Sequence, residues 1–124
     1  MSPSYRDATI NSVEANPTGS GSTGGGRDES GKPYFFPNIS ISIGYWFDNE
    51  GIPNSDWNTH FTAKLFINGA PVETKQVLSN GGPQTYSFFT YKFPEPGTYT
   101  AEVRGKNSKS VTITIKSPEQ KKAA

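Results

Sequence analysis

The stretch Asn38-Ile-Ser-Ile-Ser-Ile-Gly-Tyr-Trp-Phe-Asp-Asn49 decides the fold class, because large apolar residues occupy every second position from Ile39 to Phe47. Successive side chains of a strand point to opposite faces, so these five residues share one face. Their neighbours, such as Ser42 and Gly44, are small or polar, which is typical of an antiparallel sheet buried on one side. No amphipathic helix is evident to cover that side, so the second layer must be another sheet.

The same alternation predicts six further strands. They lie at residues 7–15, 61–67, 71–78, 84–93, 99–103 and 111–115. The first is predicted to be an edge strand with a bulge, because its alternation changes parity at Val13. Asn68-Gly69 predicts a tight hairpin turn, since both residues tolerate positive φ. In the strand over 84–93, Tyr86 and Phe88 are predicted to share one face, and Phe89, Tyr91 and Phe93 the other.

Seven short strands separated by turn signals predict an all-β fold, a seven-stranded antiparallel Ig-like β-sandwich related to fibronectin III domains. The segment Glu95-Pro-Gly-Thr-Tyr-Thr-Ala101 supports this prediction. A Tyr two residues beyond a turn Gly, here Tyr99 after Gly97, is where such folds place a hydroxyl that bonds the backbone across the turn. The chain contains no cysteine, so the sandwich is predicted to lack a disulfide.

The 124 residues fit one domain, which we predict over residues 7–116. Residues 1–6 and 117–124 are predicted to be tails, because neither carries a strand pattern. Residues 17–32 are rich in Gly and Ser, and we predict a flexible insertion there that is dispensable for folding.

Several of these stretches resemble the cell-adhesion-related domain of bacterial and archaeal surface proteins, called CARDB. The matching pieces are Asp7-Ala-Thr-Ile10, Ile39 to Phe47 with the turn Asp48-Asn-Glu-Gly51, Leu65-Phe-Ile-Asn-Gly69 with Pro71-Val72, and Pro96-Gly-Thr-Tyr-Thr100. Together they span most of residues 7–116. The resemblance implies an Ig-like sandwich and a role in adhesion at a cell surface.

Charge and hydropathy exclude some classes of partner and targeting segment. Twelve basic and eleven acidic residues nearly cancel, so we predict no nucleic-acid partner. No stretch approaches the roughly 18 consecutive apolar residues of a membrane span, and the first residues contain no apolar run that would make a signal peptide. We therefore expect no membrane span and no signal peptide in this chain.

The residues that could carry chemistry are few. His60 is the only histidine, so neither a catalytic triad nor a multi-histidine metal site can be built, and we predict no enzyme activity and no cofactor. Asp48, Glu50 and Asp56 surround one predicted loop and could bind calcium through their oxygens. Their spacing fits no EF-hand, and solvated turn residues are the alternative.

Three aromatic residues, Trp46, Trp57 and Tyr34, are the predicted contact residues. Trp46 has the opposite parity to the apolar stripe, so it is predicted to face away from the core, and Trp57 lies in a predicted loop. Exposed aromatics serve as protein contact anchors or as stacking surfaces for sugars. The alternative is that these rings pack under a loop or against a neighbouring strand.

The sequence therefore predicts a non-catalytic structural or binding module displayed on a surface, with a protein partner or a larger assembly as its target. Two settings fit: a virion accessory protein, such as a phage capsid decoration or tail protein, and an extracellular, cell-surface adhesion domain. The alternative function is a carbohydrate-binding module in which the exposed aromatic residues stack on a glycan.

Overall fold

The computed structural model describes residues 3–17 and 25–117, and within those ranges the chain forms ten β-strands and no helix. The strands are β1 (Ser4–Asp7), β2 (Ile10–Pro17), β3 (Gly25–Arg27), β4 (Pro33–Phe35), β5 (Ser40–Asp48), β6 (Thr59–Ile67), β7 (Ala70–Leu78), β8 (Gln84–Lys92), β9 (Gly97–Arg104) and β10 (Ser108–Ile115). The all-β class predicted from the alternating stretches is confirmed.

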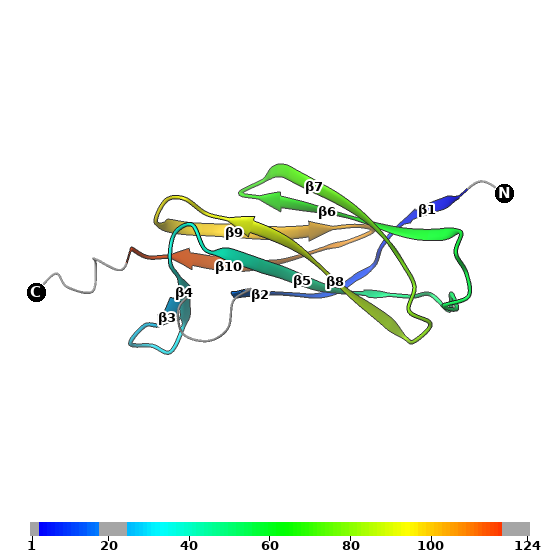
Figure 1. Ribbon diagram of the computed structural model, residues 1–124, viewed down its shortest axis with the longest axis horizontal. Helices are drawn as coiled ribbons and strands as arrows, with labels where there is room; N and C mark the ends of the chain where they lie inside the picture. Colours follow the sequence, from blue (N-terminus) through cyan, green and yellow to red (C-terminus); the bar gives the residue numbers. More distant parts are fainter. Residues whose placement is uncertain (1–2, 18–24, 118–124) are drawn as a thin grey trace, which may run out of the picture.

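The strands form two sheets and run along the long axis of the molecule, with loops gathered at both ends (Figure 1). The smaller sheet has three strands in the order β2-β5-β8, so β5 lies at its centre. The larger sheet has the order β1-β6-β9-β10-β4-β3, and β7 pairs with the other edge of β6. β1 and β9 share one edge of β6, where they pair with residues 59–62 and 64–67 respectively.

The core lies between the two sheets. From β5 the alternating residues Ile41, Ile43, Tyr45 and Phe47 are all buried, as the sequence predicted. From the larger sheet the core receives Phe61, Ala63, Leu65, Ile67, Ala101, Val103, Ile113 and Ile115. The rings of Phe47 on β5 and Phe61 on β6 lie 5.1 Å apart and so join the two layers. The two-layer arrangement follows from the need of each sheet to cover one apolar face.

Tyr45 is the core residue with a polar end. Its ring stacks on Phe89 of β8 at 5.4 Å, and its cross-strand partner is Ser87. Burial raises the pKa of the Tyr45 hydroxyl, so this residue stays neutral in the folded protein.

The predicted strand count and pairing need correction. The sequence predicted seven antiparallel strands, whereas the larger sheet is mixed, with β1 parallel to β6 and β10 parallel to β4. The strands that were missed, β1, β3 and β4, have three or four residues each and no apolar alternation. Such strands are held by backbone pairing and leave no periodic signal in the sequence.

The N-terminal segment also differs from the prediction of a tail over residues 1–6 and one strand over 7–15. Residues 4–7 form β1 in the larger sheet, and the chain then crosses to the smaller sheet, where β2 begins at Ile10. Ala8 is fully buried at the crossing, where its N–H donates to the Thr62 carbonyl at 2.9 Å. The predicted bulge and edge position are both found in β2, whose register with β5 shifts between Ile10 and Ser12.

The Gly-rich segment is only partly described. Residues 18–24 and 118–124 lie outside the described residues. The structure therefore does not address the predicted flexibility of residues 18–24 or the predicted tail at residues 118–124. Residues 25–32 were predicted to be flexible, yet β3 pairs with β4 as a hairpin. Asp28 closes its turn by accepting hydrogen bonds from the backbone of Ser30 at 2.9 Å and of Lys32 at 3.0 Å. These bonds explain the order, because an Asp side chain can substitute for the backbone in a turn.

Two predicted turns are present. β6 and β7 form an antiparallel hairpin around Asn68 and Gly69, which have φ values of 50° and 83°. Before β9, the Tyr99 hydroxyl donates to the Glu95 carbonyl at 2.7 Å, which is the bond predicted for this tyrosine. Gly97 between them has a φ of 151°, a conformation that favours glycine.

We predict that Ile41→Asp unfolds the domain, because Ile41 is fully buried and an unpaired carboxylate there costs several kcal/mol, on the order of the whole stability. Ser42→Asp, on the opposite face of the same strand, should change stability by less than about 1 kcal/mol. Thermal melting of both variants, followed by circular dichroism, checks the assignment. Equal melting temperatures would contradict it.

We predict that Tyr99→Phe lowers the free energy of unfolding by about 0.5–1.5 kcal/mol, since it removes one hydrogen bond and keeps the ring. The bond lies at the surface, which keeps the loss near the lower end of that range. Urea denaturation gives the measurement. The control is Tyr91→Phe, which removes a hydroxyl from the same aromatic cluster without touching the turn, and an equal effect of the two substitutions would argue against a special role of the Tyr99 bond.

Candidate functional site

The outer face of the smaller sheet carries three aromatic side chains, Trp46, Tyr86 and Phe88, which we call the aromatic face. The register of β5 with β8 places Trp46 opposite Tyr86 and Gly44 opposite Phe88. The rings of Trp46 and Tyr86 lie 5.1 Å apart. Tyr86 is 39% exposed and Phe88 45% exposed, whereas a half-buried sheet normally presents polar residues on its outer side. This departure from the usual pattern makes the face the strongest candidate for a contact surface.

Gly44 explains how Tyr86 is held. A Cβ atom at Gly44 would lie 2.0 Å from the Tyr86 Oη and 2.6 Å from its Cζ, so the ring occupies the space that any other residue would fill. The ring therefore lies over the backbone of β5 instead of standing out into water. Glycine inside a strand weakens the strand, and close approach by another group is one of the established reasons for keeping it there.

Phe88 is supported from the neighbouring sheet. The Lys75 Nζ of β7 lies 4.7 Å from the centre of the Phe88 ring and donates a hydrogen bond to the Phe88 backbone carbonyl. The cation–π contact holds the Phe88 ring, and the hydrogen bond occupies a backbone acceptor on the outer edge of β8. Lysine on an edge also opposes pairing with another sheet.

The rest of the outer face is polar. The pairing of the three strands places Ser12, Glu14 and Asn16 of β2, Ser42 of β5 and Thr90 of β8 around the aromatic rings. The Asn16 side chain donates to the Glu14 carboxylate at 3.0 Å. Hydroxyls, an amide and one carboxylate thus surround the rings within the same surface.

The other two predicted contact residues lie elsewhere. Tyr34 is buried in β4, whose neighbour Phe35 pairs with Ile115 at the end of β10, whereas Trp57 precedes β6 in the loop over residues 49–58. The path from the end of β10 along β9 and then β6 to that loop passes about twelve strand residues, on the order of 40 Å. Trp46, Trp57 and Tyr34 therefore cannot form one stacking surface. Sequence reasoning placed Tyr86 and Phe88 on one face of their strand but did not select them as contact residues.

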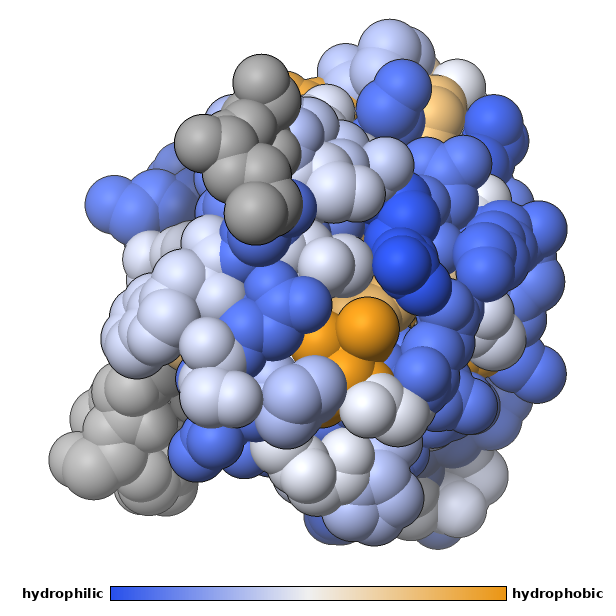
Figure 2. Space-filling view, turned by 90° about the vertical axis from the view of Figure 1, so that its right-hand side faces the viewer, coloured by the Kyte–Doolittle hydropathy of each residue, from blue (hydrophilic) through white to orange (hydrophobic). Residues whose placement is uncertain are grey.

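Trp57 belongs to the loop between β5 and β6, at the right-hand end of the molecule in Figure 1. Figure 2 shows that end, which is largely hydrophilic with a small hydrophobic patch near its centre. The Trp57 side chain is 78% exposed. The adjacent backbone is fixed, because Asp56 accepts hydrogen bonds from the N–H groups of Asn58 at 2.7 Å and Thr59 at 2.9 Å. These bonds hold the pKa of Asp56 below its usual range. The predicted exposure of Trp57 is thus found, on a loop with a defined shape.

A buried asparagine joins this loop to the one before β8. Asn49 is fully buried, and its amide donates to the Asn80 side chain at 2.8 Å and the Gly82 carbonyl at 2.7 Å. Its oxygen accepts from the Thr85 hydroxyl at 2.6 Å. Buried polar groups that are all paired favour one arrangement of the surrounding backbone. The loop end is therefore organised by a hydrogen-bond network.

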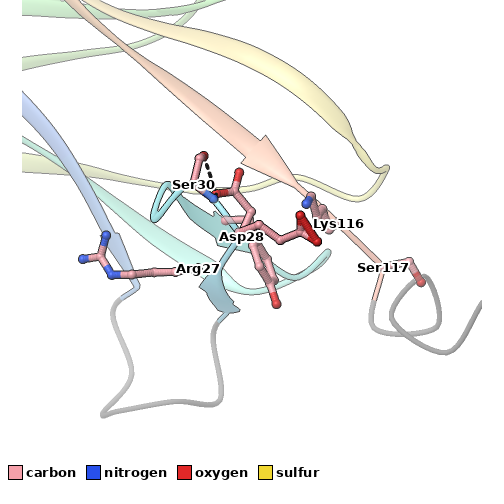
Figure 3. Close-up of a pocket in the computed structure, with 7 residues that line it drawn as sticks. Arg27, Asp28, Ser30, Lys116 and Ser117 are labelled. Atoms are coloured by element: carbon pink, nitrogen blue, oxygen red, sulfur yellow. Dashed lines mark hydrogen bonds between the residues drawn. The ribbon is translucent and has the colours of Figure 1, made fainter.

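Tyr34 contributes to an open hollow of about 640 Å³ beside the β3–β4 hairpin, shown in Figure 3. The hollow is lined by Arg27, Asp28, Glu29, Ser30, Tyr34, Lys116 and Ser117. Three of its four charged groups have partners within the chain: Lys116 lies 5.0 Å from the centre of the Tyr34 ring, Arg27 donates to the Gly31 carbonyl at 2.7 Å, and the Asp28 carboxylate holds the hairpin turn. These internal bonds make the hollow a consequence of the hairpin and a weaker candidate than the aromatic face.

The predicted calcium ligands have structural partners. Asp48 accepts from the Glu50 N–H at 2.7 Å, and Asp56 holds the turn before β6. Glu50 accepts from Arg6 at 2.9 Å and from Lys106 at 2.8 Å, which ties this loop to β1 and to the turn before β10. Among residues 3–17 and 25–117, no three His, Cys, Asp or Glu residues gather as metal ligands would.

His60 lies at the start of β6. Its ring contacts that of Tyr5 at 5.1 Å, and its Nδ1 lies 3.1 Å from the Asn58 carbonyl oxygen.

The described part of the chain contains no helix long and apolar enough to cross a membrane. Comparison of the chain with protein-family models, with curated proteins and with solved structures finds no match. The CARDB resemblance stays a prediction from the motifs.

We predict that Glu50→Gln destabilises the protein at pH 7 and that the difference from wild type shrinks as the pH falls from about 6 to about 3. Hydrogen bonds from Lys106 and Arg6 lower the pKa of Glu50 in the folded state. A lowered pKa contributes stability above the unfolded value and loses that contribution as the pH falls through the folded value. Urea midpoints at several pH values provide the measurement.

The control for this substitution is Glu95→Gln, because the Glu95 side chain forms none of the salt bridges seen between described residues. Its effect should be small at every pH. If the difference in stability between Glu50→Gln and wild type stayed constant with pH, the negative charge of Glu50 would contribute nothing to stability, which contradicts the prediction.

Proposed function

We propose that this chain is a non-catalytic binding module with an Ig-like sandwich fold, displayed on a surface, and that the aromatic face is its contact surface. The carrying observation is the exposure of Tyr86 and Phe88 beside Trp46 on the outer side of a sheet. Exposed aromatic groups cost solvation free energy in the isolated protein and are enriched where binding energy is concentrated.

Two features support the Ig-like assignment. The Tyr99 hydroxyl bonds the backbone four residues upstream at the turn before β9, as the tyrosine of such sandwiches does. The N-terminal segment contributes β1 to one sheet and β2 to the other, which fits two sheets packed over a common core. The CARDB resemblance supports the same fold and an adhesive role.

Two locations are proposed for the module: a virion, as an accessory protein such as a capsid decoration or tail protein, or a cell surface, as an adhesion domain. The genes beside its own distinguish the two. In both settings the module attaches through a preformed surface and performs no reaction. Genes for capsid or tail proteins beside its own would support the first setting, and genes for envelope proteins would support the second.

The contact surface is tested with Tyr86→Ser and Gly44→Ala. The second substitution removes no aromatic group, but its methyl would displace the far end of the Tyr86 side chain from its place over β5. Both variants should fold and should bind intact cells or virions of the natural source at least tenfold more weakly than wild type in co-sedimentation. Circular dichroism and melting temperature establish folding.

Trp57→Ser is the matched control, because it removes an exposed aromatic group at the loop end of the molecule. Its binding should equal that of wild type. Binding that is lost with Trp57 and retained without Tyr86 would place the contact surface on the loops and contradict the proposal.

A further inference from the structure

We infer that the aromatic face binds an uncharged polysaccharide. This inference rests on the proposed function and names the ligand class of the same surface. It follows from three properties of the face: an aromatic ring laid on the sheet, hydrogen-bonding groups around it, and a set of outward residues that includes two carboxylates and no aliphatic side chain.

The first property is the position of Tyr86. Its ring covers Gly44, and the residue is 39% exposed, so one side of the ring rests on the strand while the side chain stays open to solvent. Sugar rings carry patches of C–H groups that pack on the faces of aromatic rings, whereas a protruding ring would suit a pocket in a protein partner. A ring supported from below is suited to stacking.

The second property is the polar surround. Ser12 lies opposite Trp46, Glu14 opposite Gly44, and Ser42 opposite Thr90. A hydroxyl group both donates and accepts hydrogen bonds, and a carboxylate accepts several, so this set matches the hydroxyl groups at the edge of a sugar ring. Ser and Glu are depleted in protein–protein interfaces, where the surface around the aromatic anchors is drier.

The third property is what the outward positions lack. Across β2, β5 and β8 the alternation gives these outward residues: Ser12, Glu14, Asn16, Ser40, Ser42, Gly44, Trp46, Asp48, Gln84, Tyr86, Phe88, Thr90 and Lys92. None of them is Leu, Ile, Val or Met, so the apolar area is entirely aromatic. The carboxylates of Glu14 and Asp48 disfavour an anionic chain. Of the two lysines near the face, Lys92 lies at the far end of β8, and the Lys75 ammonium already contacts the Phe88 ring and carbonyl.

The extent of the face indicates a chain rather than one sugar. Phe88 follows Tyr86 by two positions along β8, about 7 Å in an extended strand, and Trp46 lies beside Tyr86. Successive rings of a polysaccharide can therefore contact successive aromatic groups. Two contacts in one chain add their binding energies without a second loss of translational freedom.

The experiment is affinity electrophoresis of the whole chain in native gels that contain one soluble polysaccharide each. The uncharged set is laminarin, xylan, galactomannan, mannan, dextran and pullulan, and dextran sulfate represents anionic chains. We expect at least one uncharged polysaccharide to retard the protein, with the apparent affinity lowered at least tenfold by Tyr86→Ser and by Gly44→Ala. Trp57→Ser should migrate as wild type does.

Three results would overturn the inference: no retardation by any uncharged polysaccharide, retardation that Tyr86→Ser leaves unchanged, or a preference for dextran sulfate. A second arm separates this inference from the proposed function. Cells or virions are oxidised with periodate, which destroys sugar rings with adjacent hydroxyls, and co-sedimentation is repeated. Laminarin is the check on this arm, because its 1,3-linked rings lack adjacent hydroxyls and resist periodate. Binding to oxidised cells or virions that depends on Tyr86, together with no retardation by laminarin, overturns the polysaccharide and leaves the contact surface intact. Binding that does not depend on Tyr86 overturns both.

Discussion

The alternation of β5 is the constraint on which the rest of the structure depends. This strand is the centre of the smaller sheet and pairs with β2 on one side and β8 on the other. Its inward residues build the core with the larger sheet, through contacts such as that of Phe47 with Phe61. Because the side-chain period of a strand is two, fixing the inward set also fixes the outward one. Gly44 and Trp46 face outward for the same reason that Ile43 and Tyr45 face inward.

Features that arise from neighbouring residues could be predicted from the sequence. The alternating strands, the bulge in β2 and the hairpin at Asn68-Gly69 all depend on local pattern, and the structure contains each of them. The Tyr99 bond belongs to the same group, because donor and acceptor are only four residues apart. The two-sheet architecture followed from these local features by a single general rule, that every apolar face must be covered.

Features that depend on distant pairing could not be predicted. β1 consists of Ser-Tyr-Arg-Asp and is held to β6 by parallel pairing, with more than fifty residues between the partners, so no pattern within it indicates a strand. The candidate site has the same origin. The outward direction of Trp46 and the shared face of Tyr86 and Phe88 could be predicted strand by strand, but the proximity of the three rings depends on the register of β5 with β8. Trp57 and Tyr34 were grouped with Trp46 by residue type alone, and the topology separates them.

Gly44 shows how a local feature of one strand and the pairing of distant strands act together. A glycine in the middle of a strand destabilises that strand by roughly 0.5–1 kcal/mol relative to alanine, and the core side of β5 gains nothing from it. On the outer side its missing side chain lets Tyr86 lie over the backbone. A ring held there has already lost rotational freedom before any ligand arrives, and this preorganisation lowers the entropy that binding must overcome. The strand thus gives up a small amount of stability at a position where a binding surface would gain affinity, and this is the physical reason for proposing the outer face of the smaller sheet as the contact surface.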